Sequence, residues 1–128
     1  MVDEKGEECR VYVLRKRDSA EWQGLAAKGD ENAQVCIWAV GKFYRLMTDE
    51  PSWCACCEVN FAPSDIPQAF IILIPVRRNP PDITARTFAV CAECSKQEDN
   101  WLVDQGVRRD GLARSSLSTA GYFAGCSL

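Results

Sequence analysis

The chain has 128 residues and a formal net charge of -3, with 47% apolar and 26% charged residues. These proportions are typical of one soluble globular domain, and they include no basic excess of the kind that marks nucleic-acid binding. Because the sequence contains no histidine, Ser-His-Asp and Cys-His nucleophilic catalysis, His-ligated metal sites and HNH-type nucleases are excluded.

The first third of the chain predicts a strand followed by two helices. Residues 9–14 are rich in β-branched and aromatic residues, as strands are. Asp18 and Glu21 have the spacing of a capping box at the start of a first helix. Asp30 can cap a second helix, which Pro51 would end.

The second predicted helix has apolar residues every three to four positions, which form one continuous face of about four turns. These residues are Ala33, Cys36 or Ile37, Val40, Phe43 or Tyr44, and Met47. We expect this face to pack on another element, with Cys36 as a buried free thiol.

The middle of the chain predicts a turn-rich cysteine segment followed by a β-hairpin. Residues 70–74 form an all-apolar strand, Asn79–Asp82 is a strong turn signal, and residues 83–90 return as the second strand. Strand 70–74 has large apolar side chains on both faces. We therefore expect the N-terminal helices to cover one face and a C-terminal helix to cover the other.

The last part of the chain predicts a helix and then a tail. Residues 95–105 lack proline and glycine and contain Trp101, so we expect a helix that stops at Gly106. Residues 111–128 are rich in glycine, serine and alanine, which predicts a loosely docked tail. The whole chain is then one α+β domain, divided into N-terminal strand and helices (1–50), a metal module (51–110) and a tail (111–128).

Two Cys-x-x-Cys pairs, separated by 33 residues, are the strongest functional signal in the sequence. Four thiolates in this spacing form a closed tetrahedral shell, which favours one structural Zn²⁺ ion, with iron as the alternative metal. The predicted ligands are Cys54, Cys57, Cys91 and Cys94. Structural zinc contributes about 10–16 kcal/mol in small modules, so residues 51–106 should depend on the ion.

Other interpretations of these cysteines remain open from the sequence alone. Cys56 could replace Cys57 as a ligand by forming a tighter Cys-x-Cys loop. Disulfides would require an oxidising compartment, which nothing in the sequence marks. A redox-active Cys-x-x-Cys is a further alternative, although the matched second pair argues against it.

The order of cysteine knuckle, hairpin and helix over residues 53–106 resembles the treble-clef zinc finger. This resemblance implies that Cys91 and Cys94 lie at the N-terminus of the C-terminal helix, whose free amides stabilise thiolate charge. Many such knuckles have glycine after the second cysteine, where this chain has Glu58. The Trp53-Cys-x-x-Cys opening is also similar to small uncharacterised bacterial proteins, which implies no function.

For function, the sequence favours a binding module over an enzyme, because four thiolates leave a zinc ion no open position and no phosphate-binding motif is present. The binding module we predict first is a nucleic-acid-binding one, which would use arginines near the hairpin turn and after the helix, with support from Arg86 and Arg114. Its candidate residues are Arg77, Arg78, Arg108 and Arg109.

The alternative is a protein-interaction module, and a thiol redox protein is less favoured. An apolar patch for a protein partner could be formed by Trp53, Ile71, Leu73 and Trp101, unless these side chains belong to the core. No motif indicates a small-molecule cofactor. We expect a cytoplasmic protein without membrane association, because residues 1–8 are acidic and the longest apolar run (69–76) is short.

Overall fold

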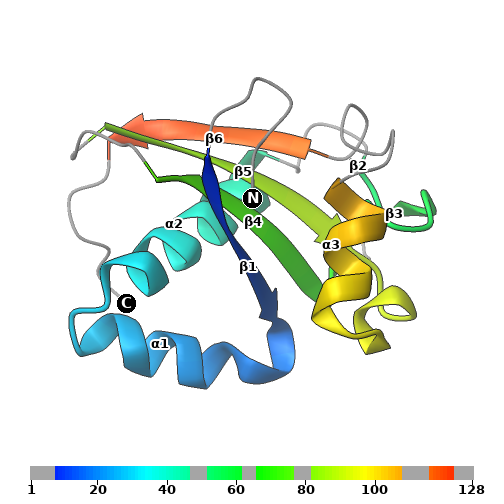
Figure 1. The fold of residues 1–128 in the computed structure, drawn as a ribbon, viewed down its shortest axis with the longest axis horizontal. Coiled ribbons are helices and arrows are strands. Elements are labelled where there is room, and N and C mark those ends of the chain that lie inside the picture. The colour runs from blue at the N-terminus through cyan, green and yellow to red at the C-terminus, as the bar shows by residue number, and fades with distance from the viewer. Residues whose placement is uncertain (1–7, 47–51, 62–65, 77–81, 108–115, 123–128) are drawn as a thin grey trace.

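The computed structural model describes residues 8–46, 52–61, 66–76, 82–107 and 116–122. Its centre is a four-stranded antiparallel sheet with the strand order β1-β4-β5-β6 (Figure 1). The strands are β1 (Cys9–Arg15), β4 (Ala69–Pro75), β5 (Asp82–Val90) and β6 (Ser116–Tyr122).

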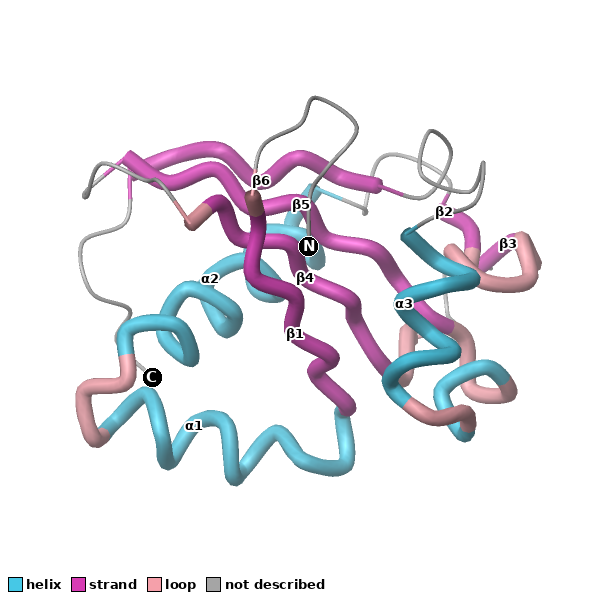
Figure 2. The backbone as a smooth tube through the Cα atoms, viewed as in Figure 1, coloured by secondary structure: helices cyan, strands magenta, loops and turns pink. Residues whose placement is uncertain are grey.

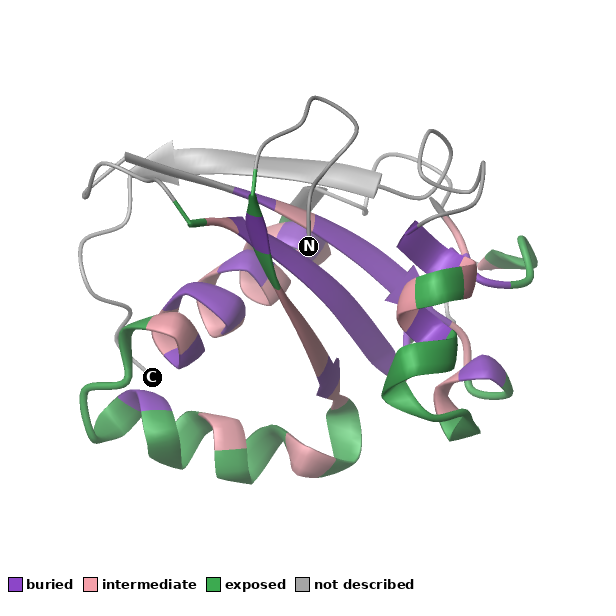
Figure 3. Cartoon of the chain, in the orientation of Figure 1, coloured by how far each residue is buried: buried purple, intermediate pink, exposed green. Residues whose placement is uncertain are grey.

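The predicted hairpin is confirmed as β4 and β5, which form the middle of the sheet. Ile71 pairs with Phe88 and Ile72 pairs with Thr87, so successive residues of β4 alternate between the two faces. Residues 69–74 of β4 are all buried (Figure 3). The expectation that this strand is covered on both faces is therefore confirmed.

One face of the sheet is covered by α1 (Ser19–Ala27) and α2 (Glu31–Leu46). The predicted cap of α2 is present, because the Ala33 N–H donates to Asp30 Oδ1 at 3.0 Å. The predicted capping box of α1 is wrong: Asp18 makes no side-chain cap hydrogen bond. The 3-10 turn η1 (Lys16–Asp18) leads directly into α1, so Asp18 lacks the extended backbone that an N-cap residue needs.

The core on this face is apolar and aromatic. Phe43 of α2 packs edge-to-face on Phe70 of β4, with ring centroids 5.3 Å apart, and Tyr44 packs on the same ring at 5.5 Å. The buried side of α2 is close to the predicted one, with Cys36 fully buried as expected. Such contacts between large side chains stabilise the helices without any further ligand.

The opposite face carries smaller elements, which include the cysteine segments. These are the short strands β2 (Ser52–Trp53) and β3 (Asn60–Phe61), the 3-10 turn η2 (Cys94–Lys96) and α3 (Asp99–Val107). Figure 2 shows η2 and α3 as separate helical segments joined by a loop. The predicted single helix over 95–105 is therefore wrong at its start, since α3 begins at Asp99.

Gly106 does not end α3, which continues to Val107. A Cβ added at Gly106 would lie 2.7 Å from Ile71 Cδ1 and 3.4 Å from Ala55 Cβ and Cys56 Sγ. The glycine is thus a position at which α3 comes close to both the sheet and the first cysteine turn. The prediction that Gly106 stops the helix is wrong, because glycine is typical both of helix ends and of places where two backbones come close together.

The prediction of a loosely docked tail fails for Ser116–Tyr122, which form β6. This strand pairs with β5 over seven residues, from Asp82–Tyr122 to Phe88–Ser116. Its serine, alanine and glycine residues are weak strand formers, and the ladder to the outer edge of β5 provides the backbone hydrogen bonds that compensate for this. The remaining tail residues, 111–115 and 123–128, lie outside the described ones.

The described elements make an α+β fold in which a tetracysteine cluster lies beside the sheet. None of the described helices combines the length and apolarity that crossing a bilayer requires.

Candidate metal centre

The first cysteine pair lies in the turn that joins β2 to β3. The Cys54 N–H donates to the Val59 carbonyl at 2.8 Å, and the Glu58 N–H donates to the Cys54 carbonyl at 2.9 Å. Glu58 has a φ of 64°, the left-handed conformation that glycine adopts at little cost. The chain therefore makes the turn of a glycine-containing knuckle with a glutamate in the strained position.

This first turn is fixed to the sheet at the end of β5. The Ala55 N–H donates to the Ala89 carbonyl at 2.8 Å, just beyond the last residue of β5 that pairs with β6. Ala55 and Cys56 also contact α3 near Gly106. The turn is thus held from two sides, by a sheet edge and by a helix.

The second cysteine pair follows β5 directly, and its turn repeats the hydrogen bond of the first. The Ser95 N–H donates to the Cys91 carbonyl at 2.9 Å, as Glu58 does to Cys54. Cys94 is the first residue of η2, and it lies five residues before the start of α3. The expectation that this pair occupies the N-terminus of the C-terminal helix is therefore wrong.

Arg15, at the end of β1, holds the segment that follows Cys94. Its Nε donates to the Ser95 carbonyl at 3.2 Å, its Nη2 donates to the Gln97 carbonyl at 2.6 Å, and its Nη1 pairs with Asp99. The Arg15 side chain is only 11% exposed. This role of Arg15 is not predicted from the sequence, because Arg15 begins a run of three basic residues that is typical of a solvated strand end.

The four predicted ligands come together between the two turns. The Sγ atoms of Cys54, Cys57, Cys91 and Cys94 all lie within 4.8 Å of one another, and those of Cys57 and Cys91 are 3.6 Å apart. Tetrahedral zinc with bonds of about 2.3 Å places its sulfurs about 3.8 Å apart. The four cysteines are therefore positioned to bind a metal ion.

Cys56 lies outside this cluster. Its Sγ is 3.8 Å from the Leu102 carbonyl of α3, and the residue is buried. The group of four Sγ atoms that lie within 4.8 Å of one another includes Cys57 and does not include Cys56. The geometry thus favours Cys57 over Cys56 as the second ligand of the first pair, which the sequence alone left open.

The cluster also favours negative charge at one sulfur in particular. Cys54 Sγ accepts the N–H groups of Cys56 and Cys91, each at 3.4 Å. A hydrogen bond from the Cys56 thiol is the main cause that lowers the pKa of Cys54 to about 4, and these backbone donors add to it. The same hydrogen bond raises the pKa of Cys56.

The pKa values of two other thiols in the cluster shift in the opposite direction. Burial raises the pKa of Cys57 and of Cys94, and the negative charge of Cys54 raises that of Cys94 further. Four thiolates at these distances repel one another unless a cation lies between them. The chemistry of the donor set is therefore that of a site for a metal ion.

The candidate nucleic-acid residues Arg77, Arg78, Arg108 and Arg109 lie outside the described residues, as does Arg114. Arg86 is described, and its guanidinium lies over the Phe88 ring, 5.7 Å from the centroid. In the candidate apolar patch, Ile71 and Leu73 are core residues with 0% and 1% exposure, so they are not available to a partner. Trp101 is 38% exposed.

Comparison with protein-family models, curated proteins and solved structures gives no match to this chain. These comparisons support neither the likeness to treble-clef fingers nor the likeness to small bacterial proteins. The metal centre is therefore inferred from the geometry of the four cysteines alone.

Proposed function

We propose that the protein is a zinc-binding protein whose single Zn²⁺ ion is structural, with Cys54, Cys57, Cys91 and Cys94 as its four ligands. The observation that carries this proposal is the clustering of the four Sγ atoms within 4.8 Å. Four thiolates fill the coordination shell, so no position remains for a substrate or a reactive water.

The positions of the ligands in the fold support a structural role. The ion would join the β2–β3 turn to the segment between β5 and α3, two parts of the chain that are more than thirty residues apart in sequence. It would close this long loop and hold α3 on the sheet. Iron in the same four-sulfur shell is the alternative, and it is distinguished by its absorption in the visible range.

Metal analysis of the reduced, purified protein tests this proposal. We expect one equivalent of zinc per chain in the wild type and in Cys56→Ala, and loss of zinc in Cys57→Ala. Cys56→Ala is the matched control because it removes a thiol from the same turn. Less than a tenth of an equivalent of any transition metal in the wild type, or retention of zinc by Cys57→Ala and its loss from Cys56→Ala, would contradict the proposed ligand set.

For the biological role, we propose that the module binds a protein partner. The described surface near the cysteine turns and α3 is mainly acidic, and Lys96 and Arg15, the basic residues there, are ion-paired with Glu93 and Asp99. A negative surface repels the phosphate backbone of nucleic acids. The acidic residues are Glu58, Glu93, Glu98, Asp99 and Asp104.

Nucleic-acid binding stays a prediction that rests on the arginines named from the sequence. Salt-dependent retention of DNA or RNA by the wild type, lost in the variant with Arg77, Arg78, Arg108 and Arg109 changed to Ala, would support it over the protein-partner proposal. We expect neither retention nor an effect of these changes at physiological ionic strength.

A further inference from the structure

The four proposed zinc ligands differ in how far solvent reaches them. Cys54 is fully buried and Cys94 is 7% exposed, whereas Cys57 is exposed and Cys91 is half-buried. Cys54 Sγ is also fixed in place, because it accepts the N–H groups of Cys56 and Cys91. One side of the cluster therefore belongs to the core, and the other side faces solvent.

The two sulfurs on the solvent side are neighbours. The Sγ atoms of Cys57 and Cys91 are 3.6 Å apart, and a shift of about 1.5 Å would bring them to the length of a disulfide bond. Cys57 belongs to the turn between β2 and β3, and Cys91 to the segment that follows β5. A bond between them would join the same two parts of the chain that the proposed ion joins.

Exposure decides which of the four sulfurs meets an oxidant first. The thiolate is the nucleophilic form of cysteine, and cysteine ligands are deprotonated when a metal ion is bound. All four sulfurs of the loaded site are then thiolates, so they differ in susceptibility to oxidation mainly through their exposure. Cys57 is the most accessible of the four to a small molecule in solution.

We propose that the metal centre is a redox switch, in which hydrogen peroxide oxidises Cys57, Cys91 joins it in a disulfide, and the site loses its zinc ion. The inference rests on the structural zinc site proposed above and adds a modification site to it. Sulfenic acids condense in this way with a neighbouring cysteine. Cys91 is the resolving residue because its sulfur is both close to Cys57 and on the solvent side.

The reaction has two steps, and its atoms and electrons balance. The Cys57 thiolate attacks the peroxide, so that an S–O bond forms, the O–O bond breaks and hydroxide leaves. The Cys91 thiolate then attacks the Cys57 sulfur, so that the S–S bond forms, the S–O bond breaks and a second hydroxide leaves. The two sulfurs lose two electrons to the peroxide, and each hydroxide takes a proton from the solvent to become water.

The disulfide removes two of the four ligands. Only Cys54 and Cys94 keep their negative charge, and structural zinc sites need four ligands. Two thiolates compete poorly with water and with other chelators for the ion. Oxidation of the exposed pair is therefore sufficient to release the metal, although the buried pair is not oxidised.

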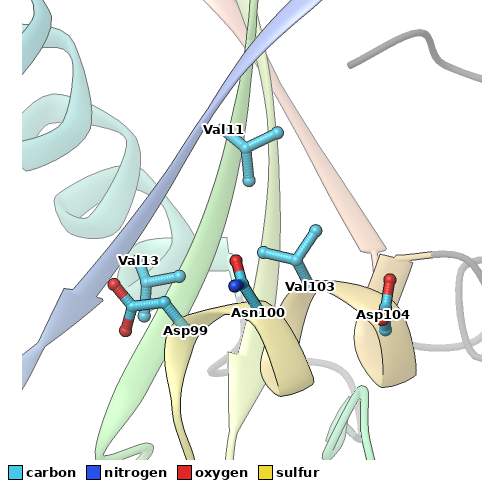
Figure 4. Close-up of a pocket in the computed structure, with 6 residues that line it drawn as sticks. All are labelled: Val11, Val13, Asp99, Asn100, Val103 and Asp104. Atoms are coloured by element: carbon cyan, nitrogen blue, oxygen red, sulfur yellow. The ribbon is translucent and has the colours of Figure 1, made fainter.

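The helix α3 should respond to this loss, because it packs on the first cysteine turn. The Leu102 carbonyl is 3.8 Å from Cys56 Sγ, and Gly106 lies against the same turn. Towards β1, in contrast, an open groove of about 480 Å³ lies between Val11 of β1 and Val103 of α3 (Figure 4). The cysteine turn thus supports α3 more closely than β1 does at this groove.

The test treats the reduced, zinc-loaded full chain with hydrogen peroxide, beside a chelator that changes colour when it binds zinc. We expect one zinc ion to be released and two thiols to be lost for each peroxide consumed, and both to be recovered with a reductant and zinc. Peptide mapping should find Cys57 joined to Cys91. Zinc that stays bound after two thiols are lost, or a disulfide within either Cys-x-x-Cys pair, would overturn the proposal.

Alkylation and control variants test the roles of the individual thiols. Limited iodoacetamide should modify Cys57 of the loaded protein at least about tenfold faster than Cys54, and equal rates would overturn the proposal. Cys56→Ala, Cys36→Ala and Cys126→Ser should each release zinc within about twofold of the wild-type rate, because none of these thiols takes part. Protection from release in Cys56→Ala would identify Cys56 as the resolving residue and overturn the assignment to Cys91.

Zinc content before oxidation separates this proposal from that of the metal centre. A chain that holds one equivalent of zinc and keeps it under peroxide counts against the switch and leaves the centre intact, whereas a chain without metal overturns both. Amide exchange at Leu102 should be at least about tenfold faster in the oxidised protein than in the loaded one. Unchanged exchange there would show that α3 does not respond, and it would overturn the switch.

Discussion

The two faces of the sheet are covered in different ways. On one face, α2 is a 16-residue helix whose buried side packs large side chains such as Phe43 on Phe70. On the other face, α3 has nine residues and packs through Gly106 and Leu102 against cysteines and alanine. The first face is held by a core rich in aromatic side chains, and the second combines a core that includes several cysteines with the proposed ion.

Replacing one of the four proposed zinc ligands should have the largest effect on stability, because only the cysteine side of the sheet depends on the proposed ion. Cys91→Ser should abolish stoichiometric zinc binding and destabilise the protein by at least about 5 kcal/mol, because structural zinc contributes on the order of 10 kcal/mol to small modules. Metal analysis and chemical denaturation measure both effects. Cys36→Ala, in α2, is the control and should keep its zinc; cooperative unfolding with full metal content in Cys91→Ser would count against the account.

Truncating the aromatic core should destabilise the other face without affecting the metal. Phe43 is 2% exposed and packs on Phe70 and Tyr44. Phe43→Ala should therefore cost about 3–5 kcal/mol, measured by denaturant unfolding, with one equivalent of zinc retained at low denaturant. Loss of zinc from the folded variant would show that the two faces do not differ in the way described.

Arg15 connects the two regions, since it joins the end of β1 to the segment after Cys94. Arg15→Ala leaves the Ser95 and Gln97 carbonyls without their charged donor and should cost about 2 kcal/mol. It should also speed the transfer of zinc to a competing chelator. Arg17→Ala is the matched control, because the Arg17 side chain is 74% exposed and its contact to Asp18 is 3.9 Å long; equal effects of the two changes would contradict the assigned role.

Glycine-to-alanine changes in two helices give the smallest of these effects and should have opposite signs. Gly106→Ala places a Cβ 2.7 Å from Ile71 Cδ1, so overpacking should outweigh the gain in helix propensity and cost about 1–2 kcal/mol. Gly24→Ala, in α1 with no atom within 4 Å of the added Cβ, should stabilise by about 0.5–1 kcal/mol. A stabilising Gly106→Ala, measured by thermal unfolding, would show that α3 is not closely packed there.

Much of the fold could be predicted from the sequence because its signals are local. The run at 70–74 and the turn at Asn79–Asp82 predict the central hairpin, and the apolar period after Asp30 predicts α2 and its buried face. The need to cover both sides of 70–74 then places helices on both faces of the sheet. The spacing of the two cysteine pairs was enough to name the four residues that come together.

The features that the sequence did not predict depend on contacts between distant residues. β6 is held by its pairing with β5, which its own small residues do not indicate. Arg15 acquires its role from a segment 80 residues further along the chain. A glycine is needed at position 106 because Ile71 leaves no room for a Cβ there. The helix α3 starts later than predicted because residues 94–96 form the separate turn η2.

The most direct test of the account is amide hydrogen exchange of the reduced protein with and without a strong zinc chelator. If one ion holds the α3 side of the sheet, removing it should speed exchange at Leu102 by at least about a hundredfold, and by much less at Val35 and Ala39 of α2. Exchange that is unchanged at Leu102 after chelation, in a protein that holds no stoichiometric metal, would contradict the account.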